Sequence, residues 1–187
     1  MASWVGIANL ALTHIGSEPI LSLEDDTAPA RACAGVIAAV TDAVLREHPW
    51  TCAVRRARLA ADAAPPAFGY AYAYQLPADP YCLRVLDVWD QPLPWQVEGR
   101  KLLTDATPPL SIRYVARITD PEMLDASLAQ AVAVRLAAAV AYKITQSRQL
   151  ADDLWKLYEA TVPLARSTNA REIHEADPPS SFVRWRY

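Results

Sequence analysis

Glycine, histidine and cysteine are scarce in this sequence, and their scarcity argues against several kinds of chemistry. Only five glycines occur in 187 residues, and none forms the Gly-rich pattern with which a phosphate-binding loop holds a nucleotide. The three histidines, His14, His48 and His174, have no Cys, His or carboxylate at metal-ligand spacing, and no serine lies in a nucleophile elbow. We therefore expect no enzyme activity, no metal centre and no cofactor.

The sequence also lacks a cysteine pattern typical of a disulfide scaffold, an excess of basic charge and a long apolar run. The three cysteines are an odd number without a C-x-x-C pair, which favours a reduced, cytoplasmic place of synthesis. A net charge of −3 argues against binding nucleic acid over the whole surface. No uncharged apolar run of about 18 residues occurs, and the N-terminus lacks the layout of a signal peptide. We expect neither a membrane-spanning helix nor a secretion signal.

Residues 120–166 are predicted to be the central packing element. They open with Asp-Pro-Glu, which combines a capping side chain, a proline at the first helical position and an acid in the first turn. A second apolar register follows Ser147 and runs to Pro163, which kinks or ends a helix. This pattern predicts a helical hairpin or one long bent helix. The first register, with alanine between its members, consists of Leu124, Leu128, Val132, Leu136 and Val140.

The preceding part of the chain predicts helices first and strands later. Helices are expected over residues 4–14, ended by Gly16, and over residues 28–47, ended by Pro49. A short basic helix is expected over residues 51–61. The period then changes to that of strands. The expected strand segments are 70–75, 83–89, 96–98 and 100–104 around Gly99, and 110–115.

These elements predict an α+β fold with a mainly α-helical core, an inserted β-rich lobe and an extended C-terminal tail. The core would comprise residues 1–66 and 119–166, the lobe residues 67–118, and the tail residues 167–187.

Arg55, Arg56 and Arg58 form the one compact basic cluster before the tail. One interpretation is contact with DNA phosphates or with an acidic partner. The other is a solvated helix face, or arginines that pair with carboxylates across a subunit boundary, where the fork of the guanidinium fits a carboxylate. The acidic net charge favours the second interpretation.

The last six residues are a candidate docking peptide. A polar stretch precedes them, and aromatic and arginine side chains dominate interface hot spots, whereas disordered tails normally avoid aromatics. The alternative is that they fold back onto their own domain. The candidate residues are Phe182, Val183, Arg184, Trp185, Arg186 and Tyr187.

Several stretches, by their order and spacing, resemble one known family. They are residues 9–16 (NLALTHIG), 20–27 (ILSLEDDT), 48–50 (HPW), 53–60 (AVRRARLA), 68–70 (FGY), 74–79 (YQLPAD), 82–86 (CLRVL), 98–100 (EGR) and 113–121 (RYVARITDP). Together they resemble the tail tubular protein A family, which are head–tail adaptor proteins of short-tailed phages. The likeness covers roughly residues 7–166 and is weakest in the tail.

The resemblance implies a structural virion protein at the head–tail interface. It implies a homo-oligomeric ring, commonly of twelve copies, beneath the portal protein, on which the tail nozzle or tail tube protein is built. Genomic DNA would pass through the ring without sequence-specific binding, assembly would take place in the host bacterial cytoplasm, and no membrane is involved. Taking the resemblance together with the composition of the tail, we expect the helical core to make the ring and residues 182–187 to dock on the portal.

Three alternatives stay open at this point. The first is another head–tail completion or connector protein, of a long-tailed phage or of a gene-transfer particle. The second is a DNA-binding accessory factor that uses Arg55, Arg56 and Arg58, whose affinity would fall steeply with added salt. The third is a small hydrolase, against which the lack of a nucleophile–base pair argues.

Overall fold

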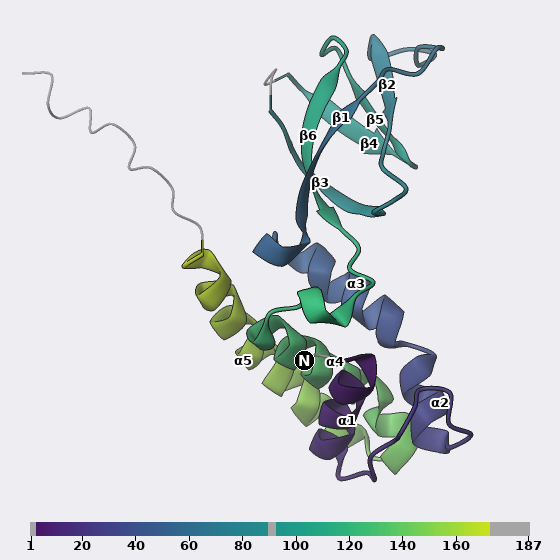
Figure 1. The fold of residues 1–187 in the computed structure, drawn as a ribbon, viewed down its shortest axis with the longest axis vertical. Helices are drawn as coiled ribbons and strands as arrows, with labels where there is room; N and C mark the ends of the chain where they lie inside the picture. Colours follow the sequence, from purple (N-terminus) through teal and green to yellow (C-terminus); the bar gives the residue numbers. More distant parts are fainter. Residues whose placement is uncertain (1–2, 90–92, 173–187) are drawn as a thin grey trace, which may run out of the picture.

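The protein is elongated, with a body of helices at one end and a lobe of strands at the other (Figure 1). This computed structural model describes residues 3–89 and 93–172. Of these described residues, 47% are helical and 21% are in strands or bridges, and they form five α-helices and two small three-stranded sheets. The predicted α+β class is therefore confirmed. We call helices α1 to α5 the helical body and strands β1 to β6 the β-lobe.

Helix α1 (Trp4–Ile15) begins and ends at the residues that the sequence indicates. The Ser3 side chain accepts a hydrogen bond from the Gly6 amide at 2.9 Å and caps the first turn. Gly16 follows the last turn with φ of 74°, a left-handed conformation that glycine adopts without strain. The buried face of α1 packs against α4. It consists of Ile7, Ala8, Ala11, Leu12 and Ile15.

The second predicted helix is wrong in one respect, because it consists of two helices. These are α2 (Ala28–Ala34) and α3 (Ile37–Glu47), which are separated at Gly35 and Val36. Glycine is among the weakest residues in a helix interior, and the alanine-rich context did not offset it. Helix α3 ends, as predicted, in an extended residue before Pro49.

Helices α4 (Ala126–Thr145) and α5 (Arg148–Ala170) lie side by side as a helical hairpin, one of the two predicted arrangements (Figure 1). The turn between them is formed by Gln146, with a left-handed φ of 59°, and by Ser147. The Ser147 hydroxyl accepts a hydrogen bond from the backbone amide of Leu150 at 3.2 Å and so starts α5.

Pro163 lies inside α5 and does not end it, so residues 167–170 belong to the helix and not to the tail, contrary to the predicted boundary. Tertiary contact holds the last turns. Asn169 is 3% exposed, and its side-chain oxygen accepts hydrogen bonds from the Thr51 amide at 2.8 Å and the Thr51 hydroxyl at 2.9 Å.

The helix start predicted at Asp120 forms a 3₁₀ turn, Pro121–Met123, and α4 begins after Asp125. The Asp125 carboxylate accepts a hydrogen bond from the Leu128 amide at 2.9 Å.

Because a lost N-cap leaves an amide unpaired, Asp125→Ala is expected to lower the free energy of unfolding by about 1 kcal/mol. Urea denaturation measures this, with Asp152→Ala, on the exposed face of α5, as the control. Equal stability of the two variants would contradict the capping role.

The β-lobe consists of two antiparallel sheets with strand orders β1-β6-β3 and β2-β5-β4. The strands are β1 (Val54–Leu59), β2 (Tyr72–Gln75), β3 (Cys82–Val88), β4 (Trp95–Glu98), β5 (Lys101–Thr104) and β6 (Leu110–Ala116). Strands β2 to β6 lie in the segments predicted as strands, except that β3, β4 and β6 each extend one residue beyond them. The tight turn between β4 and β5 contains Gly99 with φ of 57°, as its sequence indicates.

The predicted basic helix over residues 51–61 is wrong. Only the 3₁₀ turn Thr51–Ala53 precedes β1, which pairs with β6 along its whole length. Arginine, alanine and leucine favour helices, but pairing with β6 and burial of Leu59 in the lobe interior override that propensity. The β-lobe therefore begins at Val54 and not at residue 67.

One core cluster joins the β-lobe to the helical body. It contains Leu83 of β3 and Val115 of β6 together with Trp50 and residues of α3, α4 and α5. Trp50 is fully buried. A second cluster fills the body beneath α1 and α2, and a third lies in the lobe interior. The shared cluster fixes the lobe on the body.

By length and composition alone, α4 qualifies as a membrane-spanning helix, and so would α2 and α3 if the bent pair were one span. Half of the apolar window of α4 is buried inside the protein. Because the core helix of a bundle has the same properties, this finding is weak evidence for a membrane.

Candidate interaction surfaces

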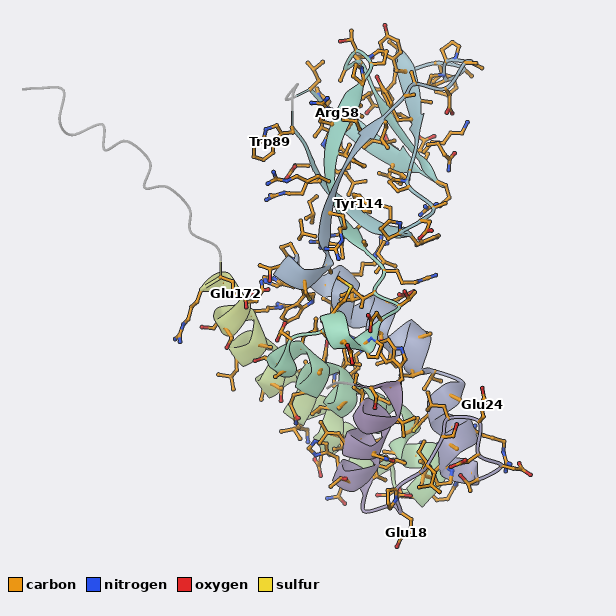
Figure 2. The ribbon with its side chains drawn as sticks, in the orientation of Figure 1. Glu18, Glu24, Arg58, Trp89, Tyr114 and Glu172 are labelled. Atoms are coloured by element: carbon orange, nitrogen blue, oxygen red, sulfur yellow. The ribbon has the colours of Figure 1, made fainter. Side chains whose placement is uncertain are left out.

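The outer face of the β1-β6-β3 sheet carries a hollow lined by arginines and a tryptophan. We call it the basic hollow. Its volume is about 410 Å³. Figure 2 shows Arg58 and Trp89 on the same side of the β-lobe. The basic hollow is lined by Arg56, Ala57, Arg58, Trp89, Ser111, Ile112 and Arg113.

Strand register explains why these residues meet. Arg56 lies opposite Arg113, and Arg58 lies opposite Ser111. Successive side chains of a strand point to opposite faces, so the exposed Arg56 and Arg58 alternate with Ala57 and Leu59, which pack against the lobe interior. The arginines of β1 thus face solvent as one row.

The basic hollow has an excess of positive charge. Arg113 forms an ion pair with Asp87, with Nη2 to Oδ2 at 2.7 Å, and Arg113 lies opposite Asp87 in the register. Within residues 3–89 and 93–172, neither Arg56 nor Arg58 forms an ion pair. Two like charges opposite each other on neighbouring strands destabilise a sheet. A bound anion would relieve this repulsion.

Trp89 forms an aromatic platform beside these charges. Its side chain is 65% exposed. The guanidinium carbons of Arg56 and Arg113 lie 5.5 Å and 6.0 Å from its ring centroid, within cation–π range. A large exposed ring beside cations offers a surface on which another planar group can stack.

The predicted cluster of three arginines is divided by the fold. Arg56 and Arg58 lie in the basic hollow, whereas Arg55 donates from Nη1 to the carbonyl oxygens of Cys52 and Val54, both at 2.9 Å. Arg55 therefore stabilises the backbone where the lobe begins. Arg113 and Trp89 were not predicted to belong to this site, because only the pairing of β1, β6 and β3 brings them to this face.

A second surface is a groove between α3, α4 and α5 with a volume of about 570 Å³, which we call the alanine groove. Trp155 is 44% exposed in it. Leu157 and Leu164 of α5 are 41% and 71% exposed and share one face of the helix, but that face is turned away from Trp155 and lies outside the groove. The groove is lined by Val36, Ala39, Val40, Ala43, Arg135, Ala138, Ala139, Ala151, Asp152 and Trp155.

Glu47 joins the three helices near one end of the alanine groove. Its carboxylate pairs with Arg135 of α4 and accepts a hydrogen bond from the Tyr158 hydroxyl of α5 at 2.7 Å. Arg166 lies 3.7 Å away, and Arg135 also donates to the Tyr158 oxygen at 3.1 Å. This network fixes α5 against α3 and α4.

Tyr158 makes stability depend on alkaline pH. Burial, followed by the hydrogen bond to Glu47, raises the pKa of Tyr158 to about 12. An unfolded tyrosine titrates near pH 10, so between about pH 10 and 12 the folded state holds a proton that the unfolded chain has released. The contribution of Tyr158 to the free energy of unfolding is therefore fully present below about pH 10 and is lost as the pH rises to about 12 and beyond.

Wild-type protein is expected to lose about 2 kcal/mol more than Tyr158→Phe between about pH 9 and 12. Denaturant unfolding at each pH measures the difference. Burial raises the pKa of Tyr74 and Tyr114 as well, and both proteins retain these groups, so the difference isolates Tyr158. Parallel pH profiles would contradict the assignment.

The described residues bring together no set of metal ligands. Among them, no group of three or more His, Cys, Asp or Glu side chains is placed to hold a metal ion. The Nε2 atom of His48 lies 3.3 Å from Nδ2 of Asn169. Burial lowers the pKa of His48, and the positive charges of Arg166 and Arg84 lower it further. His14 lies 3.4 Å from Gln130.

The three cysteines show no sign of reactive thiols. All three are free, and burial raises the pKa of Cys33, Cys52 and Cys82, which disfavours the nucleophilic thiolate. His174 and the predicted docking residues, Phe182 to Tyr187, lie outside the described residues.

Comparison of the chain with protein-family models found no match, and comparison with curated proteins found none either.

Proposed function

We propose that this protein is a head–tail adaptor of a phage virion, a structural protein without catalytic activity. Its copies would form a ring, of about twelve by the family resemblance, that joins the capsid portal to the tail nozzle and lets genomic DNA pass. The observation that carries the proposal is the alanine groove, an apolar hollow between α3, α4 and α5 in which Trp155 is 44% exposed.

The alanine groove has the properties of a contact between copies. Small side chains allow a neighbouring helix to approach closely, and an exposed tryptophan is a typical interface anchor. Exposed apolar surface that is contiguous over several side chains marks an interaction site in soluble proteins. A ring needs two different complementary faces on each copy, and no catalytic residues. The occupant we assign to the groove is a second copy of this chain.

The elongated shape supports two further contacts. The helical body and the β-lobe lie at opposite ends and share one core cluster, so they can meet different partners as one rigid unit. In this proposal the β-lobe faces the nozzle or the adjacent copy, and the tail docks on the portal.

Deletion of residues 182–187 is expected to weaken binding to the portal at least tenfold, because tryptophan and arginine anchors each contribute about 2 kcal/mol or more at hot spots. The full chain and the truncated chain are titrated against purified portal by sedimentation. Circular dichroism and urea unfolding of the truncated chain provide the control for folding. Unchanged portal affinity would contradict docking through the tail.

A further inference from the structure

Charge is distributed unevenly between the two ends of the molecule. Residues 54–118 contain eight basic and six acidic side chains, whereas residues 1–53 and 119–172 contain eight basic and thirteen acidic ones. The net charge is therefore +2 for the β-lobe and −5 for the helical body. Figure 2 shows Glu18 and Glu24 at the end of the body remote from the lobe. A polyanion is repelled by the body and attracted to the lobe.

The geometry points to the basic hollow as a binding site for single-stranded nucleic acid, with Arg56 and Arg58 on successive phosphates and a base stacked on Trp89. This inference does not depend on the adaptor proposal. Proteins that hold single strands combine a positively charged surface along the backbone with aromatic side chains under the bases.

The spacing on β1 fits a strand of phosphates. Residues two apart on one face of a strand are separated by about 6.6 Å. This is close to the separation of successive phosphates along one nucleic-acid strand, so Arg56 and Arg58 can each contact one phosphate. Each guanidinium presents the planar fork that phosphate oxygens accept. A single carboxylate of a protein partner would neutralise only one of these two arginines.

Trp89 favours a nucleic acid over an acidic protein surface. A protein hot spot surrounds its aromatic anchor with apolar groups that exclude water. Here the ring is 65% exposed, and the long side chains lining the basic hollow beside it, Arg56, Arg58 and Arg113, are cationic. The hollow of about 410 Å³ has the size of a small-molecule site and can take a nucleotide.

Asp87 reduces the net positive charge of the basic hollow, because it pairs with Arg113. Its Oδ2 pairs with Arg113, and its Oδ1 is buried without a hydrogen-bond partner among the described residues. Asp87 thereby holds Arg113 in place next to Trp89 and leaves the positive charge of Arg56 and Arg58 for the phosphates.

Fluorescence anisotropy with a labelled oligothymidylate of about 16 nucleotides tests the assignment, since single-strand sites span about 4–16 nucleotides. The full chain is titrated over a salt series. Arg56→Ala/Arg58→Ala is expected to weaken binding at least tenfold and to reduce the slope of log K against log salt by about 1.4, because each single-strand phosphate contact contributes about 0.7. Trp89→Ala is expected to weaken binding about tenfold, and Trp89→Phe less.

The matched control is Arg148→Ala/Arg171→Ala, which removes two exposed arginines from the helical body. It is expected to leave affinity within a factor of about two. Urea unfolding of each variant shows that the β-lobe remains folded. Tryptophan fluorescence of the wild type should be quenched on binding, and Trp89→Ala should lose that part of the quenching.

Three results would overturn the assignment. The first is no binding at low salt, or equal weakening by the control pair. The second is binding to a duplex of the same sequence as tightly as to the single strand, without an effect of Trp89→Ala. The third is assembly of the wild type, but not of Arg56→Ala/Arg58→Ala, into larger species without nucleic acid, which would place these arginines against carboxylates of a second copy. The titration needs no portal, so its failure leaves the adaptor proposal in place.

Discussion

Replacing Trp50 with alanine is expected to lower the free energy of unfolding by about 3–5 kcal/mol, the range for a buried tryptophan. Trp50 is 0% exposed in the cluster that joins the β-lobe to the helical body. Its indole Nε1 donates to the Val44 carbonyl oxygen at 3.0 Å, one of the last carbonyls of α3. The Trp50 ring also packs edge-on against the His48 ring, with 4.9 Å between the two ring centroids. The variant therefore loses packing and a helix-end hydrogen bond together.

Urea unfolding of the wild type, Trp50→Ala, Trp50→Phe and Trp155→Ala measures this effect. Phenylalanine keeps most of the buried ring and loses the indole N–H, so we expect a cost of about 1–2 kcal/mol. Trp155 is 44% exposed, and its removal should cost less than about 1 kcal/mol. If Trp50→Ala cost no more than Trp155→Ala, the shared core would not hold the lobe on the body.

A charge placed in the alanine groove is expected to prevent ring formation while the protein remains folded. Ala139 of α4 lines the groove and is exposed in the single chain. Ala139→Arg therefore should change the free energy of unfolding by no more than about 0.5 kcal/mol. In a ring the same side chain would fill the space of a neighbouring copy and bury an unpaired charge, which costs several kcal/mol per contact.

The control is Ala34→Arg, on the exposed end of α2 and outside the alanine groove. Analytical ultracentrifugation of each variant with portal separates rings from single copies. Ala34→Arg should assemble as the wild type does. Assembly of Ala139→Arg to the same mass would show that the groove is not the contact between copies.

Local signals were sufficient for much of the fold. Gly16 follows the end of α1 and Gly99 lies in the tight turn between β4 and β5, as predicted, and the change from a helical to a strand period located β2 to β6 to within two residues. Helix starts were less secure, because Asp120 and Asp125 both have a capping side chain and only the second begins α4.

Errors arose where contacts distant in sequence decide the structure. The composition of β1 favours a helix, and its strand conformation depends on pairing with β6, whose partner residues lie between 51 (Leu59 to Leu110) and 61 (Val54 to Val115) positions later. Pro163 does not end α5, one of its two predicted effects, and the hydrogen bond between Asn169 and Thr51 holds the turns of the helix that follow it. For the same reason only Arg56 and Arg58 of the basic hollow were identified from the sequence. Arg113 and Trp89 come close to Arg56 through strand pairing in the sheet.

Assembly of copies of this chain into a ring on a portal is tested most directly by the mass of the purified protein in solution, alone and then mixed with portal. Native mass spectrometry or light scattering gives both values. The proposal predicts a defined complex with a fixed, whole number of copies per portal ring, of about twelve by the family resemblance. A protein whose mass does not change with portal at concentrations well above micromolar would contradict the adaptor function.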